Sequence, residues 1–174
     1  MKQLKIKQLE SAIYKSPIGE ILMIADGEQL CLLDFADNDE RVERLLRRRY
    51  GNFEMTPKAN VLNMQSRMDR YFGGDWAAFD GLPMAADGTV FQQRVWDSLK
   101  TIPVGEAISY RQLASAINQP KAVRAVASAN ANNQIAIIIP CHRVIGKDGS
   151  LRGYAGGADR KAWLLNHEGF SARF

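Results

Sequence analysis

One short segment of the chain carries side chains suited to nucleophilic chemistry. Cys141, His142 and Arg143 follow one another directly, after an apolar run over residues 135–139 and Pro140. A cysteine at the end of an apolar run with a cation beside it is a candidate nucleophile, which must become a thiolate to attack. Because neighbouring residues project in different directions, we expect His142 to reach Cys141 through a bridging water.

A carboxylate near the C-terminus could complete this arrangement. Glu168 follows an apolar helical stretch over residues 162–166, beside the second histidine, His167, and before Gly169. A carboxylate that accepts the ring N–H of His142 would fix its tautomer and give a Cys–water–His–Glu relay. The sequence leaves open whether Glu168 reaches His142, and a buried structural cysteine remains the alternative. A metal site has less support than either of these interpretations, because no pair of cysteine or histidine residues has the spacing of metal ligands.

Composition restricts the possible classes of protein. The chain has 174 residues, 46% hydrophobic and 24% charged, which is typical of a globular protein. No apolar run approaches the length of a membrane span, and the N-terminus alternates charged and apolar residues, so we expect no membrane association and no secretory signal. Cys31 and Cys141 are too few and too far apart for a disulfide framework, which favours the cytoplasm. Cys31 lies within an apolar run and is expected to be core.

The positive charge lies in the second half of the chain. Residues 1–86 hold 12 Lys and Arg against 13 Asp and Glu, whereas residues 87–174 hold 11 against 6. A local excess of this kind attracts phosphates, although solvated surfaces also produce it. The second half is therefore the candidate nucleic-acid-binding half.

The first half has a mixed α and β pattern. Apolar runs over residues 21–24 and 30–33 flank an Asp-Gly pair, which predicts a hairpin. Helices are expected over residues 39–50 and 61–72, followed by a linker-like stretch over residues 77–86. We therefore predict an α+β protein with an N-terminal domain over residues 1–80, a linker over 81–88 and a mostly helical domain over 89–174.

The second half predicts two capped helices and a third, basic one. Thr89 and Ser109 each stand three residues before a glutamine, so helices should run from there to about residues 101 and 117. A third helix begins near residue 121, which gives a helix-turn-helix pattern. Its outward face is small and basic and should bind DNA without detailed base reading, in close contact with the backbone or in the minor groove. That face comprises Lys121, Arg124, Ala125 and Ser128.

Several segments of the second half together resemble the O6-alkylguanine-DNA alkyltransferases, proteins that take an alkyl group from DNA onto their own cysteine. The similarity covers about residues 87–170. It is carried by Pro140-Cys141-His142-Arg143-Val144-Ile145-Gly146 and by residues 105–110, 121–126, 153–157 and 161–169. Residues 1–86 match only in layout, with an N-terminal domain expected to be RNase H-like and a C-terminal domain expected to be winged-helix-like.

The resemblance implies a role for each matching residue. Cys141 would accept the alkyl group, His142 would be the water-mediated base and Glu168 would orient it. Asn133 would be the hinge between the recognition helix and the reactive segment. The remaining implied residues bind DNA or line the guanine pocket: Lys121, Ala122, Arg124, Ala125 and Ser128 on DNA, with Arg124 filling the gap left by the flipped nucleotide, and Tyr110, Val144, Tyr154 and Ala155 around the base.

The resemblance also implies the substrate and partners. It predicts single-turnover repair of double-stranded DNA containing O6-alkylguanine, with O4-alkylthymine as a second substrate, by a protein that needs no cofactor and no metal. We expect a monomer in solution and leave cooperative binding along DNA open. Gln134 stands where members of the family often have a proline, and Ala155 stands where the eukaryotic members have a serine. The alternatives are a cysteine hydrolase built on Cys141, and a regulator that uses the helix-turn-helix alone.

Overall fold

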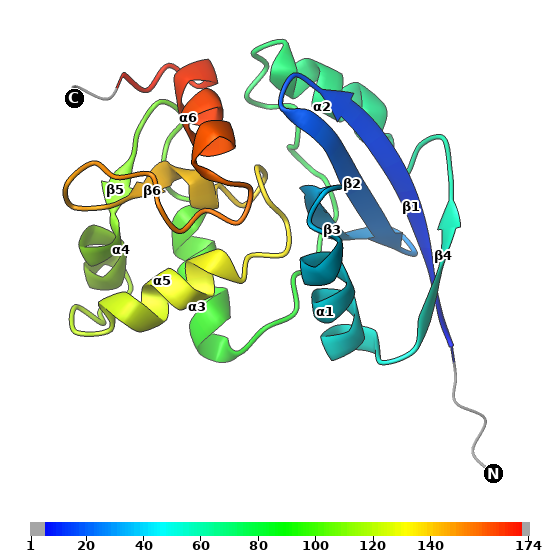
Figure 1. Cartoon of the computed structure of the whole chain (residues 1–174), viewed down its shortest axis with the longest axis horizontal. Coiled ribbons are helices and arrows are strands. Elements are labelled where there is room, and N and C mark those ends of the chain that lie inside the picture. Colours follow the sequence, from blue (N-terminus) through cyan, green and yellow to red (C-terminus); the bar gives the residue numbers. More distant parts are fainter. Residues whose placement is uncertain (1–5, 172–174) are drawn as a thin grey trace. The chain divides into compact units, whose positions relative to one another are not determined.

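The structure is a computed structural model that describes residues 6–171. The chain forms two compact units, Met1–Asp87 and Gly88–Phe174, each of which is described below by itself (Figure 1). In the described part of the chain, no helix has the length and apolar character needed to span a membrane.

The first unit is built on a four-stranded sheet. Its strands are β1 (Lys7–Ser16), β2 (Gly19–Asp26), β3 (Gln29–Phe35) and β4 (Phe53–Pro57), in the order β3-β2-β1-β4. β1, β2 and β3 pair antiparallel, and β4 pairs parallel to β1. The predicted hairpin is confirmed: Gly27 has a φ of 58°, which a glycine adopts without a steric penalty.

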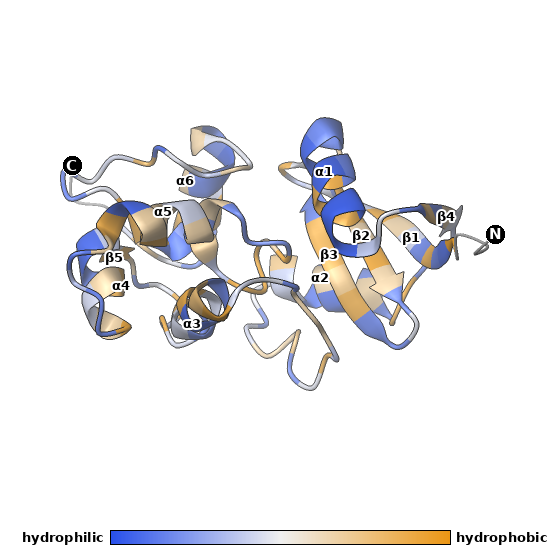
Figure 2. Cartoon of the chain, turned by 90° about the horizontal axis from the view of Figure 1, so that it is seen from below, coloured by the Kyte–Doolittle hydropathy of each residue, from blue (hydrophilic) through white to orange (hydrophobic). Residues whose placement is uncertain are grey.

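Two helices accompany this sheet. α1 (Asp39–Tyr50) lies where the sequence predicts it and packs Val42, Leu45 and Leu46 against Leu9, Ile24, Cys31 and Leu32. α2 (Met64–Phe72) contacts β1, where Tyr14 donates to Asp69 at 2.8 Å. Because Leu9 and Tyr14 point to opposite faces of β1, the two helices cover different faces of the sheet. Figure 2 shows α1 as mainly hydrophilic over the hydrophobic strands β2 and β3.

The predicted start of the second helix was wrong. The helix begins at Met64, because Leu62 and Asn63 have φ values of 50° and 56°, in the left-handed region. A right-handed helix cannot pass through such residues, so Val61 is buried from an irregular turn. The apolar spacing over residues 61–72 reports burial correctly but does not report backbone handedness.

Residues 83–85, which lie within the stretch expected to be a linker, pack on the first unit. Leu30 donates its backbone N–H to the Pro83 carbonyl, and Ala85 donates to the Leu30 carbonyl, both at 2.9 Å. Arg49 adds a hydrogen bond to the Ala85 carbonyl. The chain therefore extends the edge of β3 before it passes to the second unit.

Helices dominate the second unit. α3 (Val90–Leu99), α4 (Tyr110–Ala116) and α5 (Val123–Ala131) pack against one another. Both predicted capping boxes are present, at Thr89 and at Ser109. Trp96 is buried and donates its indole N–H to the Ala129 carbonyl at 2.9 Å, which fixes α3 against α5. α3 ends at Leu99, two residues before the predicted end.

The remaining elements bring the reactive segment into this helical frame. A short 3₁₀ helix, η1 (Cys141–Arg143), leads into β6 (Val144–Ile145), which pairs parallel with β5 (Ile108–Ser109). The last helix, α6 (Ala158–His167), contacts η1. Because β6 directly follows η1 and β5 directly precedes α4, this pairing ties the reactive segment to the start of α4.

Candidate active site

The Asn133 side chain organises the approach to the reactive cysteine. Its Nδ2 donates to the Ile139 carbonyl at 2.7 Å and to Cys141 Sγ at 3.1 Å. Its Oδ1 accepts the backbone N–H of Ile135 at 3.0 Å. Asn133 is 2% exposed, so these bonds form away from solvent. One amide thus holds both ends of the apolar segment and places a donor on the sulfur.

The apolar segment itself is an irregular, buried loop. Ile137 has a φ of 69°, a left-handed conformation that is costly for a β-branched side chain. Ile137 is 2% exposed, so packing and the bonds of Asn133 hold it there. The loop delivers Pro140 and Cys141 to η1.

Cys141 is buried and does not form a disulfide bond. The residue is 5% exposed, and its carbonyl accepts a 3.3 Å hydrogen bond from Asn130 Nδ2. Because α5 carries Asn130, this helix and the cysteine backbone are directly connected.

His142 and Glu168 come together as the relay hypothesis requires. His142 Nε2 lies 3.0 Å from Glu168 Oε1, and both side chains are fully buried. The ring N–H is not well aligned with the oxygen, so this is a close polar contact without ideal hydrogen-bond geometry. Among the described residues His142 Nδ1 has no hydrogen-bond partner. With the proton on Nε2, beside Glu168, Nδ1 is left as the basic atom.

The electrostatics of this pair are set by burial and by Arg143. Burial lowers the pKa of His142, and Glu168 opposes that shift only in part. Burial alone would raise the pKa of Glu168, but the close contact with His142 and the hydrogen bonds from Arg143 outweigh it and lower the pKa to about 2. At neutral pH the site therefore holds a neutral imidazole and a carboxylate.

Arg143 is a functional partner that the sequence analysis did not assign. Its Nε and Nη2 donate to the two oxygens of Glu168 at 2.8 and 3.0 Å, and its Nη1 donates to the Ile102 carbonyl at 2.6 Å. Such a two-point pair fixes the plane of the carboxylate. Glu168 is thus shared between His142 and Arg143, which adjacency in the sequence could not reveal.

Lys161 is a second residue that the sequence analysis missed. It lies on α6, three and four residues before the buried Leu164 and Leu165, and has no measurable exposure. Its Nζ lies 6.0 Å from the centroid of the Tyr110 ring. Burial lowers the pKa of Lys161 to about 8, while the charge of Cys141 acts in the opposite direction. The helical spacing to Leu164 and Leu165 was the available signal, because it places a lysine on an apolar face.

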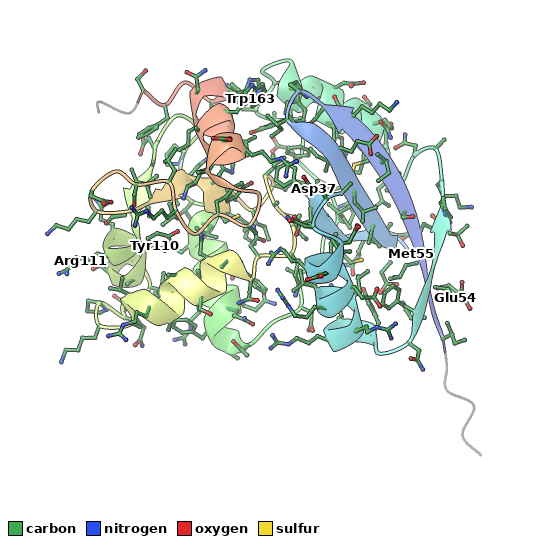
Figure 3. All side chains as sticks on the ribbon, in the orientation of Figure 1. Asp37, Glu54, Met55, Tyr110, Arg111 and Trp163 are labelled. Atoms are coloured by element: carbon green, nitrogen blue, oxygen red, sulfur yellow. The ribbon has the colours of Figure 1, made fainter. Side chains whose placement is uncertain are left out.

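The residues expected to surround the base are distributed as follows. Tyr110, which is labelled in Figure 3, is the first residue of α4. Its hydroxyl donates to the Arg152 carbonyl at 3.4 Å. The Tyr154 ring lies 6.5 Å from that of His142, at an interplanar angle of 74°. Val144 is buried, whereas Ala155 is exposed. Tyr110 and Tyr154 thus lie close to the reactive cluster.

The exposure of the residues on and just before α5 agrees with the outward face expected from the sequence. Val126 is buried and Val123 is half-buried, whereas the residues expected to bind DNA lie toward solvent. Of these, Lys121, Arg124, Ala125 and Ser128 are exposed, and Ala122 is half-buried. Lys121 and Ala122 precede the first helical residue, Val123. Across residues 6–171, no three His, Cys, Asp or Glu side chains gather in an arrangement that could hold a metal ion.

Comparison with known proteins matches both units. Residues 90–170 match the 6-O-methylguanine DNA methyltransferase DNA-binding domain, and residues 10–86 match the ribonuclease-like domain of the same family. The methylated-DNA–protein-cysteine methyltransferase of Shigella flexneri is 40% identical over 168 residues, 95% of this chain and 98% of that one. The Methanosarcina acetivorans protein of the same name is 44% identical over 164 residues, 91% and 97% of the two chains.

Solved structures give the same result. The Mycobacterium tuberculosis O6-methylguanine methyltransferase has a TM-score of 0.79 at 38% identity, with 92% of this chain and 93% of that chain covered. A structure of the M. tuberculosis protein in complex with DNA also has a TM-score of 0.79, at 39% identity, and covers 92% of both chains. With both halves matched by family models and nearly the whole chain aligned to relatives, this chain belongs to the 6-O-methylguanine DNA methyltransferase family.

Proposed function

We propose that the protein repairs DNA by moving the alkyl group of O6-alkylguanine onto its own Cys141, once per molecule. The observation that carries this proposal is the Sγ of Cys141, which accepts a hydrogen bond from Asn133 at 3.1 Å in a cluster with the His142–Glu168 pair. A donor aimed at sulfur favours the thiolate over the thiol. Family membership supports the same reaction.

The reaction balances with protein groups and one bridging water. The thiol proton passes through that water to Nδ1 of His142, and Glu168 stabilises the imidazolium that forms. Sγ then forms a bond to the alkyl carbon as the bond from that carbon to O6 breaks, and the electron pair moves onto O6. The base regains its N1–H by taking up one proton, so the net change moves one alkyl group to sulfur and one proton to guanine. The thioether product has no step that restores the thiol, which makes the protein single-use.

DNA binding is assigned to the α4–α5 pair as a helix-turn-helix within a winged-helix-like unit. The exposed face of α5 carries Arg124 and small side chains, and the exposed Lys121 lies just before the helix, which allows close approach to the minor groove. Because O6 cannot be reached inside the stack, the base must rotate out, with Arg124 filling the gap and Tyr110 assisting the rotation. Val144, Tyr154 and Ala155 would then line the guanine pocket, with Asn133 as the hinge behind it.

The remaining parts of the proposal concern organisation. We assign residues 1–80 to an RNase H-like domain, residues 81–88 to a linker and residues 89–174 to the DNA-binding and transfer domain. The protein would act as a monomer on damaged double-stranded DNA, with O4-alkylthymine as a second substrate. Because Cys141 must remain a free thiol, a reducing compartment such as the cytoplasm suits it.

Intact-mass measurement tests the transfer directly. Incubation with a duplex that contains O6-methylguanine should add one methyl group per protein, located on the Cys141 peptide, whereas an unmodified duplex should add none. An unchanged mass contradicts the proposal, and release of more than one product per protein points to a hydrolase instead.

The DNA-binding assignment needs a matched pair of variants. Arg124→Ala should weaken duplex binding and slow repair of duplex DNA more than it slows reaction with free O6-methylguanine base. Arg94→Ala removes an exposed arginine from α3 of the same unit and serves as the control. Equal slowing of duplex and free-base reactions by Arg124→Ala would remove the gap-filling role.

A further inference from the structure

Lys161 is a buried cation that neither the relay nor the DNA-binding face uses. It is one of the largest fully buried side chains of the molecule, at 0% exposure. Its Nζ makes no hydrogen bond to any residue in the described range 6–171. A buried lysine normally has a polar or charged partner, because an unpaired ammonium in a poorly polar interior is costly. Lys161 therefore needs an explanation that packing does not supply.

The other charges close to Lys161 are already balanced. Arg143 is paired with Glu168 through two hydrogen bonds, which leaves that pair with no net charge. His142, on η1, is kept neutral because burial lowers its pKa. Tyr110, on α4, is also neutral near pH 7, because burial raises its pKa. Within this cluster of described residues, Lys161 is the cation that has no fixed anion.

The anion that can form in this cluster is the thiolate of Cys141. α6, which carries Lys161, contacts η1, which carries Cys141. The charge of Cys141 acts on Lys161 in the direction that keeps the ammonium protonated. By reciprocity, the ammonium favours loss of the proton from the sulfur. Asn133 supplies a donor to Sγ but no charge, so the two contributions are separate.

We propose that Lys161 is a positioning residue that acts through Cys141: its ammonium is the counter-charge that stabilises the thiolate before transfer. The inference rests on the proposed function and adds one consequence to it. When Sγ forms its bond to the alkyl carbon, the sulfur becomes a neutral thioether. Lys161 then keeps its burial but loses its anion, and its affinity for the proton falls.

If Lys161 had only a packing role, the expected results would be different. The approach of Nζ to the Tyr110 ring is 6.0 Å, so Lys161 could serve only to support α4 through a cation–π contact. Lys161→Met keeps the apolar stem and removes the charge, whereas Lys161→Arg keeps a charge in a larger group. If packing were the whole role, Lys161→Met would leave the ionisation of Cys141 unchanged.

The test measures thiol reactivity without DNA. The rate of iodoacetamide modification of the Cys141 peptide is followed against pH in the wild type, Lys161→Met, Lys161→Arg and the control Lys147→Met, an exposed lysine of the same unit. We expect the midpoint of the Lys161→Met profile to move upward by about 1 pH unit or more, the effect of removing a nearby opposite charge. Lys161→Arg should stay closer to the wild type, and Lys147→Met should match it. A Lys161→Met profile that coincides with the wild type overturns the inference.

A second measurement needs no substitution at Lys161. In the Cys31→Ala protein, the side-chain nitrogen of Lys161 is titrated by NMR before and after Cys141 is capped with methyl methanethiosulfonate. Capping should lower the measured pKa of Lys161 by about 1 unit, because the sulfur can no longer carry charge. An unchanged titration contradicts the proposal even if Lys161→Met does not fold.

The same proteins separate this inference from the proposed function. Methyl transfer from a duplex is measured in parallel by intact mass. Transfer by the wild type with no shift in either titration removes only the role of Lys161. A shift in the titrations with no transfer from DNA removes the proposed function and leaves the ion pair.

Discussion

The two units each bury one thiol, and the hydrogen bonds on the two sulfurs run in opposite directions. Cys31 is 2% exposed and donates its S–H to the Ile24 carbonyl at 3.3 Å. Cys141 is 5% exposed and accepts a hydrogen bond from Asn133. An acceptor stabilises the protonated thiol, and a donor stabilises the thiolate. Burial by itself therefore does not distinguish a structural cysteine from a reactive one, whereas the polarity of its partners does.

The same contrast holds for the charges around the sulfurs. Burial raises the pKa of Cys31, which packs in the apolar cluster under α1, and the opposing effects of Tyr50 and Arg49 do not cancel that shift. Cys141 instead belongs to a cluster with a buried lysine, a neutral imidazole and a paired carboxylate. The first unit keeps its sulfur inert, and the second prepares its sulfur to ionise.

Removing each sulfur gives the largest expected difference. Cys141→Ala should abolish methyl transfer and leave binding to alkylated duplex intact, whereas Cys31→Ala should retain full transfer and lose about 1 kcal/mol of unfolding free energy. Intact mass and urea unfolding measure the two effects. If Cys141→Ala fails to fold and neither variant transfers the methyl group, Cys141 is a structural core residue.

The two buried carboxylates extend the comparison. Glu168→Gln removes the anion that the buried Arg143 contacts, and Asp34→Asn removes the carboxylate that Arg41 contacts at 2.8 Å in the first unit. Each change should cost about 3–5 kcal/mol of unfolding free energy, the usual result of breaking one side of a buried ion pair. Only Glu168→Gln should also slow transfer. Equal slowing in Asp34→Asn would point to a general loss of structure.

Acid should reveal Glu168 specifically. Its pKa of about 2 in the folded protein lies below the ordinary value of 4.5, so the unfolded chain takes up the proton first as the pH falls. The stability that Glu168 contributes is present above pH 4.5 and is lost toward pH 2, a difference of about 3 kcal/mol. Urea unfolding across this range should therefore bring the wild type and Glu168→Gln closer together. A constant gap would contradict the assigned contacts.

Removal of an uncharged hydrogen-bonding side chain should give the smallest effects. Asn133→Ala removes the donor to Cys141 together with the bonds to Ile135 and Ile139, and should slow transfer at least about tenfold, since a hydrogen bond to a charged group contributes about 1.5–3 kcal/mol. Tyr50→Phe removes a 3.0 Å bond from Tyr50 to Asp26 near Cys31 and should cost about 1 kcal/mol of stability with no change in transfer. Single-turnover rates and thermal melts measure both. If Tyr50→Phe slowed transfer, the surroundings of Cys31 would have a role beyond stability, which contradicts the prediction.

The sequence predicted the parts of this molecule that depend on local pattern. The hairpin at Gly27 and the caps at Thr89 and Ser109 are all present. The contact of His142 with Glu168 was left open by the residue pattern and implied only by the family resemblance. It missed the left-handed turn at Leu62 and Asn63, because apolar spacing does not encode backbone handedness. Where the pattern is local, residue type and spacing are sufficient.

The sequence could not predict the electrostatic surroundings of the site. Lysine is usually exposed, so nothing local marked Lys161 as buried except its spacing to Leu164 and Leu165. Arg143 could be identified as a nearby cation, but its sharing of Glu168 with His142 depends on residues 25 positions apart. Such contacts arise from tertiary packing, which a single sequence does not display.

The low exposure of Cys141 also has a consequence for the lifetime of the protein in the cell. A nucleophile that reacts once is wasted if an oxidant or a free alkylating agent reaches it before a damaged base does. Because Cys141 is only 5% exposed, reagents in solution should reach its sulfur slowly, whereas a flipped base is brought to it by binding. The packing that buries Cys141 therefore also preserves each molecule for the one event in which it can act.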